Sequence, residues 1–169
     1  MSTRAKVVVT DYIEPDMEWE AAEMEKREVD FTALQLKFRP EGEVIAAVED
    51  ADVIVVNMVP FTARVIESLK NCKRIIRHGA GYDNVDVAAC TARGIPLAYC
   101  PDYCTEEVAE QAIALVLACA RQIPQTRRVL DESIAQGKWD FSGVEKCYRM
   151  AGKRLGIIGC GRIGSRVLE

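Results

Sequence analysis

Val53-Ile54-Val55-Val56 is the most strongly strand-forming stretch of this sequence. Its side chains are apolar and mostly β-branched on both faces, which is typical of a strand covered on both sides in a parallel sheet. Segments with helical periodicity flank it, one at residues 44–48 and one from Thr62 to Leu69. Because parallel strands are joined by crossover helices, this arrangement predicts an α/β fold.

The same alternation of strand-like and helix-like segments extends in both directions. Strands are predicted at residues 6–10, 31–38, 53–56, 74–76 and 96–99, and helices at residues 16–27, 44–48, 62–69 and 85–92. Repeated β-α-β order predicts a parallel sheet with helices on both faces, joined by right-handed crossovers.

The sequence changes character after Pro101. Thr105 is a predicted N-cap for a helix at residues 106–121 that is apolar almost all round, so we expect this helix to be buried. Pro124 interrupts it, and a more charged helix is predicted at residues 125–136, followed by an irregular crossing at residues 138–153. A domain boundary is therefore expected near residues 99–105.

Near its end the sequence has the spacing of a dinucleotide-binding turn. Leu155–Ile158 is a predicted strand, and it runs into Gly159-Cys160-Gly161-Arg162-Ile163-Gly164, a G-x-G-x-x-G motif. Gly159 permits a tight turn, Gly161 lets the backbone approach a pyrophosphate, and Gly164 lets the next helix lie close to its strand. The alternative is an ordinary glycine-rich β-α turn. Because only five residues follow, we expect an incomplete nucleotide unit.

A second glycine-containing loop follows the predicted strand at residues 74–76. It reads Arg77-His78-Gly79-Ala80-Gly81-Tyr82-Asp83-Asn84. Successive backbone N–H groups around Gly79 and Gly81 are suited to binding a small carboxylate at the carboxyl end of a strand. The alternative is a tight loop in which the glycines serve only backbone geometry. His78 is a candidate acid or base, although a lone histidine beside a strand end is more often structural.

Composition narrows the class of protein. The chain has 169 residues, of which 49% are hydrophobic and 28% are charged, and its net charge of −4 argues against a nucleic-acid surface. Its seven cysteines are an odd number without paired spacing and no secretion signal precedes them, so we expect reduced thiols in a cytoplasmic protein. Cys100 and Cys104 have only one histidine to accompany them, and no metal site is predicted. No apolar stretch is long enough to cross a membrane.

Four motifs in order resemble one enzyme family. They are residues 77–86, Arg93-Gly94-Ile95-Pro96, residues 100–110 and the glycine turn. Together they resemble the D-isomer-specific 2-hydroxyacid dehydrogenases, and most nearly the branch with C-terminal-binding-protein-like and phosphoglycerate-dehydrogenase-like members. The resemblance implies a flavodoxin-like parallel-sheet substrate domain at residues 1–100. Residues 101–169 would then be linker helices and the truncated start of a Rossmann NAD-binding domain.

The resemblance also implies a reaction and its binding residues. Hydride would pass between nicotinamide and C2 of a small anionic D-2-hydroxy or 2-oxo acid, with NAD as cofactor and NADP not excluded. Substrate binding would fall to Gly79, Ala80 and Gly81. The implied cofactor contacts are Ala80, Val108, Gly159, Gly161, Arg162, Ile163 and Gly164.

The implied catalytic groups are absent from this sequence. In the family an arginine, a carboxylate and a histidine follow the glycine turn, and His78 precedes it and does not match the catalytic histidine. The histidine usual after Val108-Ala109-Glu110 is also replaced, by Gln111. We therefore expect the N-terminal part of a dehydrogenase that is homodimeric at full length, with this part inactive. The alternatives are an NAD-sensing, corepressor-like scaffold and a self-standing anion-binding domain.

Overall fold

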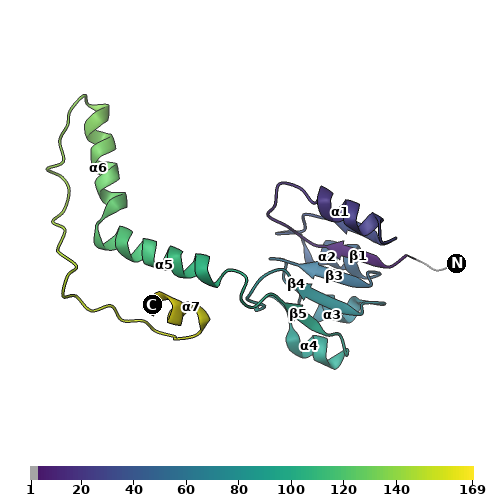
Figure 1. Ribbon diagram of the computed structural model, residues 1–169. Coiled ribbons are helices and arrows are strands. Elements are labelled where there is room, and N and C mark those ends of the chain that lie inside the picture. Colours follow the sequence, from purple (N-terminus) through teal and green to yellow (C-terminus); the bar gives the residue numbers. More distant parts are fainter. Residues whose placement is uncertain (1–3) are drawn as a thin grey trace. The chain divides into compact units, whose positions relative to one another are not determined.

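The computed structural model describes residues 4–169, and the chain divides into two compact units, Met1–Tyr103 and Cys104–Glu169 (Figure 1). The first, which we call the sheet unit, contains five parallel strands and four helices among its described residues. The second, the helical unit, contains helices and coil.

The sheet has the order β2-β1-β3-β4-β5, with every neighbouring pair parallel. Its strands are β1 (Lys6–Val9), β2 (Asp30–Ala33), β3 (Val53–Val56), β4 (Arg74–Arg77) and β5 (Leu97–Tyr99). This is the flavodoxin-like order, in which the direction of winding reverses between β1 and β3. The predicted α/β fold with a parallel sheet is confirmed.

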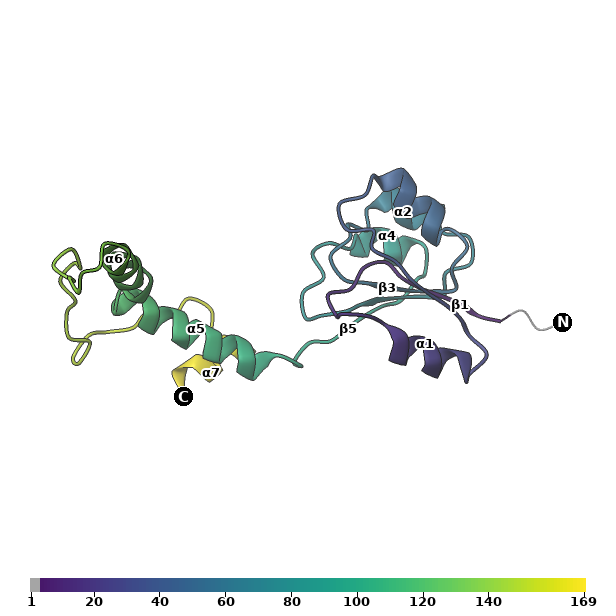
Figure 2. The same ribbon diagram turned by 90° about the horizontal axis from the view of Figure 1, so that it is seen from above.

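Helices cover the two faces of the sheet unequally. Figure 2 shows α1 on one face, with α2 and α4 on the other. The α3 helix packs against both α2 and α4. The helices of this unit are α1 (Glu18–Glu25), α2 (Glu41–Val48), α3 (Ala63–Ser68) and α4 (Val87–Ala92).

The hydrophobic core lies on the α2–α4 side of the sheet. Val8, Ile54 and Ile75 are register neighbours with no exposed surface, and they pack with the inward residues of α2, α3 and α4. The other face is apolar too, yet Val53 and Val55 are only half-buried because α1 contributes no buried residue. The β3 stretch is therefore apolar on both faces, as a covered strand should be, but only one face is sealed.

The second strand is shorter than predicted. β2 ends at Ala33, whereas the sequence predicted a strand to Phe38. The chain beyond still follows β1, since the Leu34 amide donates to the Val9 carbonyl and the Leu36 amide to the Thr10 carbonyl. Phe38 has a φ of +67° and is 90% exposed, so the extended path is broken there.

The helical unit departs from two expectations. Its helices are α5 (Thr105–Ala120), α6 (Ile123–Ala135) and α7 (Arg162–Leu168). Ala109 is the only buried residue of α5, and Leu115 is 54% exposed, so the expected burial of this helix was wrong. Leu155–Ile158 is coil instead of a strand. A strand requires a hydrogen-bonded neighbour, and no other strand lies within residues 104–169 to provide one.

Asp52 ties the amino ends of three strands and gives a testable acid sensitivity. Its carboxylate accepts hydrogen bonds from the Lys6 amide at 2.9 Å and the Lys73 ammonium at 2.9 Å, and these lower the Asp52 pKa. Because the folded pKa is depressed, the stabilisation is complete above the unfolded value near 3.8 and is lost as pH falls through the folded pKa.

We therefore expect Asp52→Asn to lower the free energy of unfolding by about 1 kcal/mol at pH 7, and by much less at pH 2. Urea unfolding at the two pH values measures this difference. The half-exposed Asp50, substituted in the same way, is the control and should show a smaller change. An equal loss for Asp52→Asn at both pH values would contradict the assignment.

Candidate functional site

The loop at residues 78–84 leaves the carboxyl end of β4, and two of its three predicted substrate-binding amides are unoccupied. The His78 amide donates to the Val56 carbonyl at 2.8 Å, and the Gly79 amide donates to the Arg77 carbonyl at 2.9 Å. Within residues 4–169, the amides of Ala80 and Gly81 have no hydrogen-bond partner. Of the three amides expected to bind substrate, at residues 79–81, only two are therefore available, because the Gly79 N–H bonds to the Arg77 carbonyl.

Arg77 adds positive charge beside this loop. A Cβ placed on Gly79 would lie 1.4 Å from Arg77 Nη1, so the guanidinium rests directly over the glycine. Nη1 donates to the His78 carbonyl at 3.0 Å, while the buried Nε has no partner among the described residues. The sequence placed Arg77 in the loop but gave no sign that its guanidinium folds back over the backbone.

Asn84 joins the loop to the neighbouring strand end. Its Nδ2 donates to the carbonyls of Asn57 at 3.1 Å and Val59 at 2.9 Å, and its own carbonyl accepts from the Phe61 amide at 2.7 Å. The Cys100 amide donates to the Gly79 carbonyl at 3.1 Å. The loop after β4 is thus held by the segments after β3 and β5.

His78 lies at the protein surface, at the carboxyl end of β4. Its Nε2 is 4.0 Å from Glu14 Oε1, and its side chain is 45% exposed. Hydrogen bonds from the backbone N–H groups of Glu14 and Ile13 lower the pKa of the Glu14 carboxyl, with a smaller contribution from His78. His78 therefore has a carboxylate neighbour, but it is not a buried structural histidine.

The glycine turn in the helical unit has the backbone geometry that its spacing predicts. Gly159 has a φ of +93°, which favours glycine, and Gly161 is the N-cap of α7. A Cβ on Gly164 would lie 2.0 Å from the Gly159 carbonyl oxygen. Only a glycine at position 164 allows the helix to approach the turn this closely, so the turn forms although its strand does not.

Three further predicted cofactor residues lie on the two helices next to this turn, whereas Ala80 lies in the loop after β4. Arg162 and Ile163 form the first turn of α7, and Val108 is on α5 with 40% of its surface exposed. Figures 1 and 2 both show α7 alongside α5. Arg166 Nε binds Glu106 Oε2 at 2.6 Å, which joins the two helices.

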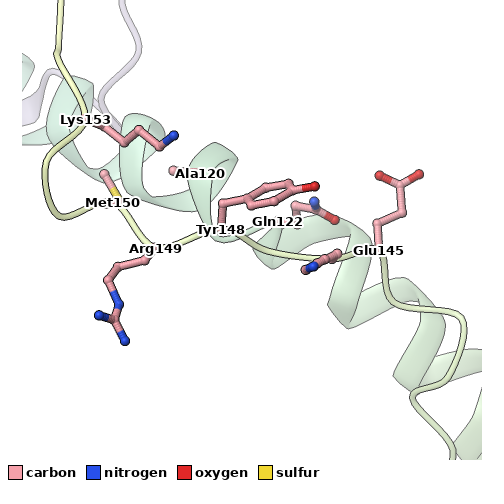
Figure 3. Close-up of a pocket in the computed structure, with 8 residues that line it drawn as sticks. Ala120, Gln122, Glu145, Tyr148, Arg149, Met150 and Lys153 are labelled. Atoms are coloured by element: carbon pink, nitrogen blue, oxygen red, sulfur yellow. The ribbon is translucent and has the colours of Figure 1, made fainter.

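A pocket of about 580 Å³ lies elsewhere in the helical unit, between the end of α5 and the coil at residues 145–153 (Figure 3). None of its lining residues belongs to the predicted site. The Arg149 side chain points away from Ala120 and Tyr148, so the basic side chains that line the pocket do not converge on one point. No three His, Cys, Asp or Glu side chains gather as a metal site in residues 4–169. In the same part of the chain, no helix has the length and apolar character needed to span a membrane.

Comparison with known proteins agrees with the motifs. Residues 7–158 match the model of the D-isomer specific 2-hydroxyacid dehydrogenase catalytic domain. The D-3-phosphoglycerate dehydrogenase of Methanocaldococcus jannaschii is 42% identical over 131 residues, which is 75% of this chain and 24% of the relative. The hydroxypyruvate reductase of Thermotoga maritima is 37% identical over 147 residues, covering 86% of this chain and 45% of that protein.

Two solved structures with the same fold contain nicotinamide cofactors. NAD+-bound 3-phosphoglycerate dehydrogenase of Entamoeba histolytica has a TM-score of 0.72 and 26% identity, over 98% of this chain and 49% of its own. An acyclic imino acid reductase in complex with NADPH and D-Arg has a TM-score of 0.77 and 27% identity, over 96% and 51%. This chain thus spans between a quarter and about half of the proteins that it matches.

Proposed function

Because the chain belongs to the D-isomer specific 2-hydroxyacid dehydrogenase family, we propose that it supplies the substrate loop and the start of the cofactor site of an NAD-dependent oxidoreductase. Such an enzyme transfers hydride between the nicotinamide and C2 of a D-2-hydroxy or 2-oxo acid. The proposal rests above all on the two unoccupied amides, at Ala80 and Gly81, beside the Arg77 guanidinium.

These groups suit the carboxylate of a small anionic acid. Amides that point outward at the end of a strand need no reorganisation to accept an anion, and a guanidinium nearby adds attraction for the negative charge. An added Cβ at Gly81 would meet only Asp83 Oδ2, at an ordinary contact distance of 3.8 Å, so no backbone atom blocks access to the amides at this position.

The cofactor proposal rests on the glycine turn. Close packing of Gly164 on Gly159 leaves the first amides of α7, at Arg162 and Ile163, directed out of the helix start, where a pyrophosphate binds in such turns. Ala80, near the nicotinamide, and Val108 are proposed as further cofactor contacts. NAD is the proposed cofactor, and NADP would use the same turn.

Binding of a small acid by this chain tests the proposed loop. In titrations with pyruvate followed by NMR, the amide signals of Ala80 and Gly81 should shift saturably. Gly81→Val should abolish these shifts, because its branched side chain covers the two amides. Gly42→Val, at a site with no atom within 4 Å of an added Cβ, is the matched control and should leave them intact. Shifts that persist in Gly81→Val would remove the loop from the site.

The 169 residues alone are expected to be catalytically inactive. His78 is their only histidine, and it precedes the glycine turn, so it does not match the family's catalytic histidine. With NADH and pyruvate, glyoxylate or hydroxypyruvate, we expect turnover below about one thousandth of an ordinary dehydrogenase rate near 10 s⁻¹. Stopped assays over hours measure this limit. Turnover at an ordinary rate by the pure chain would refute the assigned roles.

Two further features belong to the proposal. All seven cysteines are free thiols, which supports a cytoplasmic protein.

Apolar side chains on α5 and α6 are exposed, among them Ile113, Leu115 and Ile134, which supports a homodimer formed through the helical unit. Sedimentation equilibrium of the full protein would measure the oligomeric state.

A further inference from the structure

Asp11 is a buried carboxylate held almost entirely by backbone amides. It follows β1 and is only 2% exposed. The amides of Asn57 and Val59 donate to its Oδ1 at 3.2 and 3.4 Å, and the Met58 amide donates to Oδ2 at 2.8 Å. The Thr10 hydroxyl donates to Oδ1 at 2.8 Å. In the described part of the chain, no lysine, arginine or histidine forms an ion pair with this carboxylate.

Three consecutive amides that converge on one carboxylate form an anion-binding group of the kind found in loops that hold phosphates and carboxylates. We call Asn57, Met58 and Val59 the amide triplet. It lies at the carboxyl end of β3, next to β1, where the winding of the sheet reverses. In sheets of this order, that position is where an external ligand ordinarily binds. Here the position is occupied by a side chain of the protein.

The amide triplet is also joined to the proposed substrate loop. Asn84 Nδ2 donates to the carbonyls of Asn57 and Val59, so the residues that bind Asp11 through their N–H groups bind Asn84 through their C=O groups. Both Asn57 and Val59 are buried. Asp11 and the loop at residues 78–84 are therefore hydrogen-bonded to one shared segment of backbone.

We propose that Asp11 is a positioning residue that fills a latent carboxylate site at the amide triplet. By occupying the triplet, it leaves the amides of Ala80 and Gly81 as the ones available to an external acid, and through Asn84 it holds their loop in place. The statement about Ala80, Gly81 and their loop rests on the proposed function. The statement that Asp11 fills the triplet does not.

Chemical rescue by formate tests the latent site. Asp11→Ala removes the carboxylate and leaves a space of its size beside three unpaired amides. In NMR titrations of this variant with sodium formate, against sodium chloride at equal ionic strength, the amide signals of Asn57, Met58 and Val59 should shift saturably. The thermal midpoint of the variant should rise in formate and not in chloride. The wild type and Asp83→Ala, which leaves the triplet filled, should show no shift at the triplet. Their thermal midpoints should rise less in formate than that of Asp11→Ala, because formate can reach only the amides of Ala80 and Gly81.

Absence of these formate effects in a folded Asp11→Ala variant would overturn the proposal, as would equal effects in the wild type. If that variant folds only in formate and not in chloride, the rescue itself supports the proposal. Should it not fold in either salt, Asp11→Asn keeps the shape and removes the charge. Hydrogen exchange at the triplet should then accelerate at least about tenfold, and the pyruvate shifts at Ala80 should weaken; unchanged exchange would overturn the assignment.

The two proposals fail separately. Formate binding to the triplet of Asp11→Ala, without any response of Ala80 and Gly81 to pyruvate in the wild type, would support the latent site and refute the proposed substrate loop. A pyruvate response in the wild type without formate binding in the variant would do the reverse.

Discussion

Phe61→Ala is expected to lower the free energy of unfolding of the sheet unit by about 3–5 kcal/mol. Phe61 is the largest fully buried side chain among the described residues, with 1% of its surface exposed. Truncation removes its contacts with the core and leaves a cavity that the surrounding strands cannot close. Urea unfolding followed by circular dichroism measures the loss.

The effect should also reach the proposed site. The Phe61 amide donates to the Asn84 carbonyl, and the Phe61 carbonyl accepts from the Asp86 amide at 2.9 Å, so the backbone of Phe61 holds the end of the substrate loop. Phe38→Ala removes an equal side chain that is 90% exposed and should cost less than about 0.5 kcal/mol. Similar losses of unfolding free energy for the two variants would mean that the Phe61 ring does not stabilise the core.

Gly164→Val is expected to abolish the close packing of α7 on the glycine turn. An added Cβ would lie 2.0 Å from the Gly159 carbonyl oxygen and 3.0 Å from its carbon, and both are backbone atoms that cannot move aside as a flexible side chain does. Overpacking of this kind costs about 1–3 kcal/mol, which exceeds what a seven-residue helix gains by forming. The helical NMR shifts of residues 162–168 should therefore fall to coil values.

Gly156→Val is the matched control, because an added Cβ there meets no atom within 4 Å and the position precedes the turn. It should leave α7 and the contact between Arg166 and Glu106 unchanged. Retention of helical shifts in Gly164→Val would show that the turn can relax, and it would remove the steric basis for reading this motif as a phosphate-binding turn.

Local patterns predicted most elements of the sheet unit. Val53–Val56 was predicted with the bounds that the structure has, because a β-branched run between two turn regions has few other stable conformations. The glycine turn was predictable for a similar reason, since the φ of +93° at Gly159 and the close approach at Gly164 both depend on having no side chain. Such requirements act on single residues and are visible in the sequence.

Helix burial and strand pairing could not be predicted from local patterns in the same way. The apolar residues of α5 predicted a buried helix, and Leu155–Ile158 predicted a strand, yet one is exposed and the other is coil. Both outcomes depend on whether another surface or strand is present to pack against or bond with. A pattern of side chains indicates that a segment needs a packing or pairing partner, but it does not show whether that partner is present.

The candidate site divides in the same way. Residue types and spacing predicted the loop at residues 77–84 and its proposed ligand, a small acid, because glycines after a strand favour exposed amides. Only the folded chain decided which amides remain available: Gly79 bonds to Arg77, and Asn57 to Val59 bond to Asp11. Residues 46 to 48 positions apart meet there, and contacts over that separation are created by the order of strands in the sheet.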